Sequence, residues 1–512
     1  MKRLIALLLL LLLLTGCGVK PTDPDAPPAP LGDAPAAAAP VRIAAAPEAD
    51  TVIQLSDDGI TANGKAVPEF NLNGIYTAHD IVYYPTGQDS SFGEGTEADA
   101  HDPAEAEAHT VLHITEPGVY AISGKLSAGQ IAVDLGKGAK KDPTAVVTLL
   151  LDNADITCTV APAVIFYNVY ECGSKDEEDA RSEVDTSAAG ANIFLANGSV
   201  NRISGSYVAK IYKPESIELN KDGTEVKDAK KLHKYDAALY SKMSMNIDGN
   251  DGILNILAEN EGLGTELHLT VNGGDIRIES GNDGINTNED GVSVTTINGG
   301  RLTICVNGST GEGDGIDSNG WLVINGGHVA AYACGFSMDS GIDSDMGIQL
   351  NGGSVITTGN MLDEIGSSRI PYAVFSFREK QVGGAAYLLQ RSDGEAMMEA
   401  TPANDFSILI LASDVLTEDN YSLLCGDTAL SVSAAQGGMG NPGGMKPPEG
   451  FTPPDGMEMP EGFVPPQGMG PQGGMMPPQG TPSPGIPGQT GTPEGASSTF
   501  SLTFGGAYFT VF

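Results

Sequence analysis

The chain has 512 residues, which at about 100–200 residues per domain suggests two to four domains or one elongated repeat body with extensions. It carries 66 acidic residues against 27 Lys and Arg, a formal net charge of −39. Because binding of phosphate groups requires clustered cations, this balance excludes nucleic acid as a partner. It favours cation binding, or a solvated and self-repelling surface. The 67 glycines indicate strands and tight turns rather than helices.

The first 17 residues have the pattern of an export signal. Lys2 and Arg3 precede an apolar run, residues 4–14, that is too short to span a bilayer and is typical of a signal-peptide core. The run ends in Leu14-Thr15-Gly16-Cys17, which resembles the lipobox of bacterial lipoproteins. The resemblance implies cleavage before Cys17 and lipid attachment to its thiol, with an ordinary signal peptide as the alternative. Residues 18–50 are rich in Pro and Ala and are expected to be a tether between the membrane and a folded body.

Strand patterns begin near residue 51. Residues 109–133 alternate between apolar and polar positions, and residues 145–151 form another apolar strand. Residues 173–188 and 206–234 are charged and are expected to be loops inserted between strands.

Four near-identical turns recur within residues 236–368. They follow one another at spacings of 26, 27 and 26 residues, and a fixed period of this size is typical of a solenoid. The turns are Asn272-Gly273-Gly274, Asn298-Gly299-Gly300, Asn325-Gly326-Gly327 and Asn351-Gly352-Gly353. Alternating inward positions follow each turn, namely Ile276, Ile278, Leu302, Ile304, Val329, Ala331, Val355 and Thr357.

Stacking one repeat on the next would align these side chains in apolar ladders. The sequence therefore predicts an all-β fold, a right-handed parallel β-helix, because crossovers between parallel strands are right-handed. A stack of hairpin blades is the alternative, although propeller repeats are longer, at about 40–45 residues. The β-helix body is expected to occupy residues 51–435.

Three further strands are predicted after the repeats, at residues 372–377, 386–390 and 406–412. Residues 436–498 are rich in Gly, Pro, Met and Gln, cannot bury enough apolar surface to fold, and are expected to be disordered. The chain then ends in apolar alternation over residues 499–512. This ending suggests that the last strand returns to the body and that the low-complexity tract is a long internal loop.

The same repeats carry acidic turns. Asp251, Asp283 and Asp314 each begin an Asp-Gly-Ile sequence, and residues 236–368 contain 19 Asp or Glu but only three Lys or Arg. Equivalent residues of successive turns would lie about 4.8 Å apart, so a column of carboxylates would repel itself. A bound Ca²⁺, which takes roughly six to eight oxygen ligands, would remove this repulsion. Asp and Asn that merely form turns are the alternative.

The candidate calcium ligands fall in two groups along the repeats. They are Asp283, Asn286, Asn288 and Asp290, followed by Asp314, Asp317, Asp339, Asp343 and Asp345. The first group partly matches an EF-hand loop, but it begins with Asn and has Ile297 where the bidentate Glu belongs, so that motif is rejected.

The segment from Asp236-Ala237-Ala238-Leu239-Tyr240-Ser241-Lys242 through these turns to Gly359 resembles the bacterial carbohydrate-binding domain-containing lipoproteins. Pro117-Gly118-Val119-Tyr120-Ala121-Ile122-Ser123-Gly124 and Leu151-Asp152-Asn153-Ala154-Asp155-Ile156 are similar to the opening of that family, so the resemblance covers roughly residues 75–430. It implies a pectate-lyase-like parallel β-helix, calcium at the acidic turns, and recognition of cellulose or acidic pectic chains without demonstrated catalysis. It also implies a lipid-anchored protein at the outer face of the bacterial cytoplasmic membrane.

Three functions remain open from the sequence. A calcium-dependent polysaccharide binder would use aromatic side chains as sugar platforms, and Trp321 and Tyr332 are the candidates. A calcium-dependent lyase acting on polyuronates would need a basic side chain to remove a proton, and Arg277 and Arg301 are the candidates within the repeats. A structural or adhesive surface protein would bind calcium without glycan affinity. The binder is the preferred hypothesis.

Overall fold

The computed structural model describes residues 45–70, 74–435, 496–503 and 506–512. The predicted signal peptide with Cys17, residues 18–44 of the tether and residues 436–495 of the low-complexity tract lie outside the described residues. The described fold is all-β, with one short helix, α1 (Pro103–Glu107), and three 3₁₀ turns at Ala139–Lys141, Glu177–Asp179 and Pro214–Ser216. Within the described ranges, no helix is long and apolar enough to cross a membrane.

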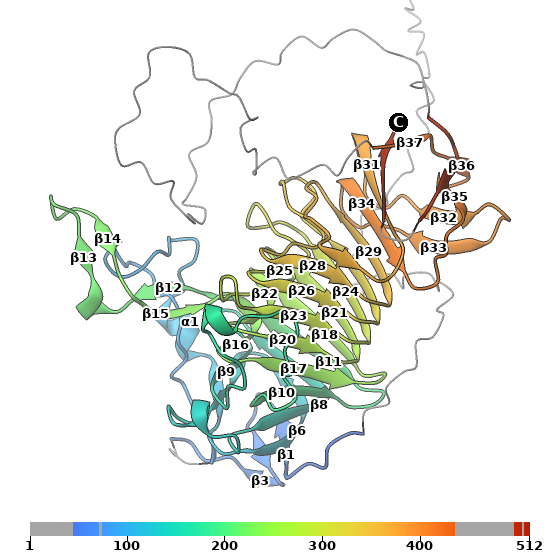
Figure 1. Cartoon of the computed structure of the whole chain (residues 1–512). Coiled ribbons are helices and arrows are strands. Elements are labelled where there is room, and N and C mark those ends of the chain that lie inside the picture. Colours follow the sequence, from blue (N-terminus) through green and yellow to red (C-terminus); the bar gives the residue numbers. More distant parts are fainter. Residues whose placement is uncertain (1–44, 71–73, 436–495, 504–505) are drawn as a thin grey trace, which may run out of the picture. The chain divides into compact units, whose positions relative to one another are not determined.

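Most strands lie in a sheet of 22 strands, in which successive repeats pair in parallel (Figure 1). One run of parallel neighbours is β1 (Thr51–Leu55), β6 (Gly118–Leu126), β8 (Val147–Cys158), β10 (Ala191–Leu195), β17 (Met245–Gly249), β20 (Leu269–Val271), β23 (Val294–Ile297), β26 (Trp321–Ile324), β28 (Gly347–Leu350) and β30 (Ser367–Ser368). The short antiparallel strands β2 (Thr61–Ala62) and β3 (Lys65–Ala66) extend its first end. Each repeat thus adds one strand beside the strand of the repeat before it.

A second parallel run in the same sheet follows the Asn-Gly-Gly turns. It contains β8, β11 (Val200–Gly205), β18 (Ile253–Ala258), β21 (Asp275–Ser280), β24 (Arg301–Val306), β27 (His328–Tyr332) and β29 (Ser354–Gly359). The turns themselves are stacked, because the Asn298, Asn325 and Asn351 amides each donate a hydrogen bond of 2.9–3.0 Å to the Asn one repeat earlier. Gly274 and its equivalents have φ between +78° and +90°, which requires glycine at that position.

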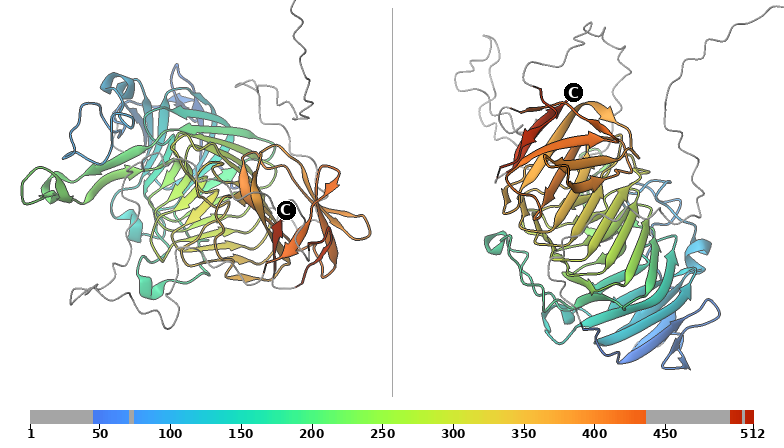
Figure 2. Two further views of the ribbon diagram at one scale, coloured as in Figure 1. Left: turned by 90° about the horizontal axis from the view of Figure 1, so that it is seen from above. Right: turned by 90° about the vertical axis from the view of Figure 1, so that its right-hand side faces the viewer.

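A separate sheet of eight strands carries the candidate site. Its order is β4 (Ile75–Ala78), β5 (Thr110–Ile114), β7 (Gly129–Asp134), β9 (Val164–Asn168), β16 (Ala237–Ser241), β19 (Glu261–Thr265), β22 (Ile285–Thr287) and β25 (Ile316–Ser318). All neighbours except β4 and β5 are parallel. Figure 2 shows the strands of the body in colour order, from blue through green to orange, so that they follow one another in chain order.

The predicted apolar ladders form the core. The eight inward positions that follow the Asn-Gly-Gly turns are all 3% exposed or less, and each pairs with its equivalent one repeat away, as in Ile276 with Leu302 and Leu302 with Val329. Residues of both large sheets belong to one continuous apolar cluster. Burial of these aliphatic side chains provides the main stabilisation, at about 25 cal/mol per Å² of apolar surface.

The charged insertion at 206–234 differs from its prediction as a loop. It forms two antiparallel hairpins, β12 (Val208–Tyr212) with β15 (Lys231–Tyr235), and β13 (Glu218–Leu219) with β14 (Val226–Asp228). Val208 and Tyr235 are buried at the base, which anchors the hairpins to the body although most of the insertion is polar. The insertion at 173–188 contains a single 3₁₀ turn and is otherwise irregular, as predicted.

The segment after the repeats forms a second apolar core. Antiparallel β34 (Phe406–Ser413) pairs with β29 and β31 (Tyr372–Gln381), and β39 (Ala507–Val511) lies parallel to β31, with β37 (Val432–Ala434) beyond it. A five-stranded sheet packs nearby, made of β32 (Tyr387–Arg391), β33 (Ala396–Ala400), β35 (Asn420–Cys425), β36 (Thr428–Ala429) and β38 (Phe500–Ser501). The expectation that the last strand returns to the body is therefore confirmed.

Candidate functional site

The candidate site lies on the solvent-facing side of the eight-stranded sheet, at the end formed by β19, β22 and β25. Leu263, Ile285 and Ile316 point into the core and are fully buried. Because side chains alternate along a strand, the residues next to them, Asn286 and Asp317, point the opposite way and lie side by side in the parallel register. An isolated bridge between Ile316 and Ile342 continues this row to Asp343.

A second row of carboxylates lies at the N-terminal ends of the same strands. The Gly262 amide donates to the Asp283 carbonyl and the Gly284 amide donates to the Asp314 carbonyl, both at 3.0 Å. These backbone bonds place the side chains of Glu261, Asp283 and Asp314 in three successive repeats. Six acidic side chains therefore occupy two adjacent rows once Asp317, Asp343 and the neighbouring Asp363 are included.

Part of this acidic set holds neighbouring repeats together. Asp283 Oδ1 accepts a hydrogen bond from the Asp314 amide at 2.8 Å, and Asp314 Oδ1 accepts one from the Ser340 amide at 2.5 Å. Asp339 Oδ2 likewise accepts one from the Gly313 amide at 2.6 Å. One oxygen of each of these carboxylates thus caps a turn. Turn formation, the alternative to calcium binding, therefore accounts for part of the recurrence of Asp in the repeats.

The carboxylates lie close enough to oppose one another's ionisation. Burial, and next the charges of Asp283, Asp345 and Asp363, raise the pKa of Asp317 to about 7. Burial and the neighbouring carboxylates Asp363, Asp317 and Asp345 raise the pKa of Asp343 to about 7 as well. Burial also raises the pKa of Asp283 to about 7 and that of Asp314 well above its ordinary value. The rows therefore concentrate carboxyl groups that oppose one another's ionisation, and the Lys234 charge acts on them at the Glu261 end.

Glu261 carries a buried carboxylate whose two oxygens differ in their contacts. It is 5% exposed, and burial, followed by Asp236 and Asp283, raises its pKa well above the ordinary value. Its Oε1 accepts a hydrogen bond from Asn286 Nδ2 at 3.0 Å, whereas its Oε2 is buried without a hydrogen-bond partner. The Oδ1 atom of Asn286 is also buried without a partner. Two adjacent residues thus each present an unused oxygen, and buried oxygens of this kind normally have a donor or a cation.

The donor set fits a hard cation. Its atoms are all carboxylate and amide oxygens, which are the ligands of Ca²⁺, and Ca²⁺ also accepts backbone carbonyls and water. Within the residues that the structure describes, no group of three or more His, Cys, Asp or Glu side chains is arranged to hold a metal ion. A calcium ion at this place would therefore need amide, backbone or water oxygens in addition to one or two carboxylates.

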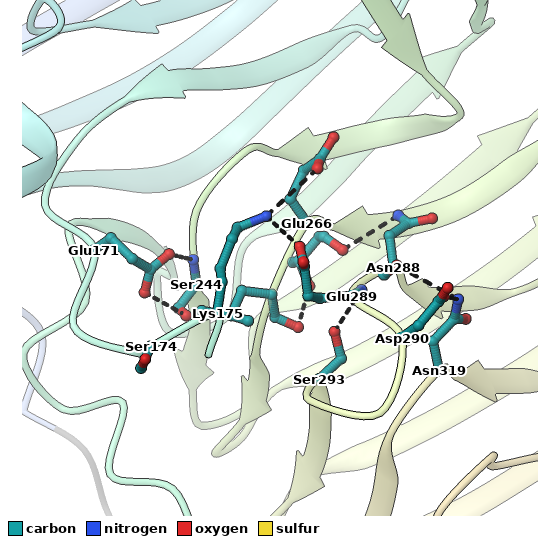
Figure 3. Close-up of polar contacts among 12 residues, drawn as sticks. Glu171, Ser174, Lys175, Ser244, Glu266, Asn288, Glu289, Asp290, Ser293 and Asn319 are labelled. Atoms are coloured by element: carbon teal, nitrogen blue, oxygen red, sulfur yellow. Dashed lines mark hydrogen bonds and ion pairs between the residues drawn. The ribbon is translucent and has the colours of Figure 1, made fainter. Parts of the chain in front are cut away.

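The remaining predicted ligands of the first group border a polar cleft beside the rows. The cleft has a volume of about 510 Å³ and is lined by Glu177, Lys231, Lys234, Asp236, Tyr240, Glu266, Asn288, Glu289, Asp290 and Asn319. Asn288 donates to the Thr265 carbonyl at 3.2 Å, and Asp290 Oδ1 accepts from Asn319 Nδ2 at 2.7 Å (Figure 3). Asp345 is exposed, and partial desolvation, followed by the charge of Asp290, raises its pKa. These residues thus connect the cleft to the acidic rows.

Three lysines from the two insertions contact the carboxylates of the cleft, and Lys231 and Lys234 are among its lining residues. Lys175, from the irregular 173–188 insertion, contacts Glu289 at 2.5 Å and Glu266 at 3.7 Å (Figure 3). Lys231, from the hairpin insertion, contacts Glu266 at 2.8 Å, and Lys234 contacts Asp236 at 2.8 Å. The cleft therefore offers both signs of charge, in contrast to the rows.

The arginines and aromatic residues predicted from the sequence lie elsewhere. Arg277 and Arg301 belong to β21 and β24 of the other large sheet, and Arg277 is bound to Asp275 by two hydrogen bonds. Both arginines therefore lie on a different sheet from the acidic rows. Tyr332 is 3% exposed and packs in the second core, so its ring is not available to a sugar. Trp321 is half-buried at the start of β26, one corner away from β25.

Sequence reasoning missed Glu261, Asp236 and the three cleft lysines. Glu261 lies in the least regular repeat and is followed by Gly-Leu-Gly, so no Asp-Gly-Ile motif marks it. The lysines come from insertions whose position over the sheet depends on tertiary packing. The number of Lys residues in the two charged insertions was the feature of the sequence that could have indicated a basic group near the site.

Comparison with known proteins identifies the family. A family model described as "Carbohydrate-binding domain-containing protein" matches residues 108–394, more than half of the chain. The chain belongs to this family.

This family member is also similar to individual proteins. A carbohydrate-binding domain-containing protein of Acetivibrio thermocellus is 28% identical over 169 residues, which are 33% of this chain and 45% of that relative. The chain thus matches less than half the length of that relative. A solved structure described as the polysaccharide lyase-like protein from C. thermocellum, a gadolinium derivative, covers 62% of this chain and 97% of that chain at 21% identity, with a TM-score of 0.34.

The matched residues of this carbohydrate-binding domain-containing protein include both acidic rows, the cleft and the two insertions. They exclude β4 and the final strands. The family assignment therefore applies to the part of the chain that carries the candidate site.

Proposed function

We propose that this protein is a non-catalytic, calcium-dependent binder of polysaccharide, and that the acidic rows with the adjoining cleft are its binding surface. The observation that carries the proposal is the buried, unpartnered Glu261 Oε2 at the end of a series of carboxylates that raise one another's pKa. A cation would satisfy this oxygen and neutralise the repulsion. Glu261, Asp283 and the Asn286 amide oxygen are proposed as the first ligand group, and Asp317 and Asp343 as the second, each completed by backbone carbonyl or water oxygens.

The substrate class that this arrangement favours is an acidic chain such as a pectic polysaccharide. Without a cation, the rows and a net charge of −39 repel a polyuronate. A calcium ion held by the rows retains positive charge toward solvent, and the cleft lysines add donors for sugar carboxylates and hydroxyls. Calcium thus serves both to stabilise the fold and to bridge protein and glycan.

The proposed architecture of the body is a right-handed parallel β-helix. The parallel register between successive repeats, the aligned aliphatic residues and the stacked Asn side chains support it. The proposed location is the outer face of the cytoplasmic membrane, through a lipid on Cys17. Replacement Cys17→Ser is expected to prevent lipid labelling and to release the protein from the membrane fraction.

The test is retention of the mature body on polygalacturonate gel and on insoluble cellulose, with calcium and with a chelator. Calcium-dependent retention, together with a supernatant free of unsaturated uronides, is the expected result. Lys231→Ala is expected to weaken retention on the acidic gel. Lys125→Ala is the matched control, because Lys125 forms a comparable surface pair with Asp155 at 2.9 Å on the other large sheet.

Other outcomes separate the alternatives. Release of unsaturated product would assign a lyase activity, and the basic group would then be sought among the cleft lysines rather than at Arg277 or Arg301. Calcium binding without retention on either material would leave a structural surface protein.

A further inference from the structure

The opposite end of the site-bearing sheet face carries an aromatic pair. Tyr76 on β4 and His113 on β5 are cross-strand partners whose rings stack with centroids 4.4 Å apart and an interplanar angle of 11°. Leu112 and Ile114, on either side of His113, are fully buried in the core, so His113 and its partner point to the outer face. Both rings are partly exposed.

This pair lies on the same face as the acidic rows. In the parallel register, His113 is followed across the sheet by Ala132, Ile165, Tyr240, Gly264, Asn286 and Asp317. From β4 to β19 there are five strand spacings, a distance of about 24 Å at about 4.8 Å per strand. A polysaccharide chain of several sugar units is long enough to cover this distance.

The middle of the face is covered by the base of the hairpin insertion. The Tyr235 ring contacts the rings of Tyr167 and Tyr240, each at 5.6 Å between centroids, and Tyr235 and Tyr240 are 2% and 1% exposed. These tyrosines are thus part of the packing and are closed to a ligand. The face has accessible side chains at its two ends, with the hairpin base between them.

Polar acceptors surround the aromatic pair. Asp80 Oδ1 lies 2.8 Å from His113 Nε2, and the Asp80 side chain is 57% exposed. Asp134, on β7, accepts a hydrogen bond from Asn168 Nδ2 at 2.8 Å, and its charge together with that of Asp80 acts on Tyr76. A ring face bordered by carboxylates is the composition that binds a neutral sugar, because the apolar C–H face packs on the ring while the hydroxyls donate to the carboxylates.

We propose that Tyr76, His113 and Asp80 form a second sugar-binding subsite, which takes a neutral hexose or pentose unit. Asp80 and Asp134 repel a uronate at this end, and the charged cleft lies at the other end. The subsite extends the proposed function, because it rests on polysaccharide binding along this face. It would select glycans that carry neutral units beside acidic ones, or neutral chains.

The test measures binding of the full mature body to a soluble neutral β-glucan oligosaccharide and to an oligogalacturonate, both with calcium present. Tyr76→Ala is expected to weaken binding of the neutral oligosaccharide about ten-fold or more and to leave calcium-dependent binding of oligogalacturonate within about two-fold. Asp80→Asn, which retains the aromatic ring, is expected to weaken neutral binding by a smaller factor. Phe336→Ala is the matched control, because Phe336 is an aromatic residue that is 65% exposed and lies on the loop between β27 and β28.

The outcomes distinguish the two proposals. If the unmodified protein binds oligogalacturonate with calcium but binds no neutral oligosaccharide, or if Tyr76→Ala matches Phe336→Ala, the subsite is refuted while the proposed function stands. If the unmodified protein binds neither oligosaccharide, both proposals fail. Circular dichroism and a thermal melt of Tyr76→Ala show whether a loss of binding reflects loss of fold, in which case the Asp80→Asn result decides.

Discussion

Replacement of Glu261 by Gln is expected to have opposite effects on the stability of the metal-free protein and of the proposed calcium-loaded protein. In the metal-free protein, the change replaces a buried carboxyl group, which burial and neighbouring carboxylates keep from ionising and whose Oε2 has no hydrogen-bond partner, with a neutral amide. Leaving such a group unsatisfied costs about 1–3 kcal/mol, so Glu261→Gln is expected to raise the free energy of unfolding by roughly that amount. In the calcium-loaded protein, the same change removes an anionic ligand and is expected to weaken calcium binding by about 10- to 100-fold.

The expected effect of calcium on the free energy of unfolding follows from this change in calcium affinity. At a calcium concentration about 100 times the dissociation constant, unmodified protein gains about 2.7 kcal/mol. A variant that binds 100-fold more weakly gains about 0.4 kcal/mol at the same concentration, because calcium then equals its dissociation constant. The assays are urea unfolding with calcium and with chelator, and calorimetric titration of calcium.

Glu279→Gln is the matched control, since Glu279 is exposed on β21 of the other large sheet. Equal calcium affinity for Glu261→Gln and Glu279→Gln would refute the placement of the cation at Glu261. A metal-free Glu261→Gln protein that is less stable than the unmodified protein would refute the account of its buried oxygen.

Three further predictions concern the rows, the other sheet and the core. The folded protein holds the pKa values of Asp283, Asp317 and Asp343 at about 7, against an ordinary 3.8. In chelator, the free energy of unfolding is therefore expected to fall as pH rises from about 4 to 7, and urea unfolding across that interval measures the fall. With calcium present, the stabilisation by calcium should grow over the same interval, and a pH-independent result would contradict this. Arg277→Ala is expected to leave glycan retention unchanged and to alter the free energy of unfolding by less than about 1 kcal/mol, because Arg277 forms a partly exposed pair with Asp275. Ile316→Ala is expected to lower the free energy of unfolding by about 2–5 kcal/mol, since Ile316 is fully buried in the core beneath the site; a loss below 1 kcal/mol would contradict the ladder.

The repeats are the part of the fold that the sequence predicted best. The spacing of the Asn-Gly-Gly turns and the two-residue alternation after each turn placed the inward residues correctly, because a strand that buries one face must alternate and a turn with positive φ needs glycine. The hairpin insertion at 206–234 was missed because its charged sequence lacks the apolar alternation that marks a strand. Its few anchoring residues, Val208 and Tyr235, become informative only when the core that they enter is known.

For the site, the sequence by itself determined which residues are acidic and the period at which they recur. Asp283, Asp314, Asp317 and Asp343 do gather in adjacent rows, because parallel register repeats whatever occurs at a fixed phase of each repeat. Only the tertiary structure decided which residues join them. Glu261 follows no motif, and the cleft lysines come from insertions that are distant along the chain. Tyr332 was lost as a sugar contact because the segment after the repeats packs over it. The periodic residues could be predicted because the same turn and the same strand alternation recur in every repeat. The cleft, its lysines and the aromatic pair depend instead on how non-repeating segments pack against the sheets.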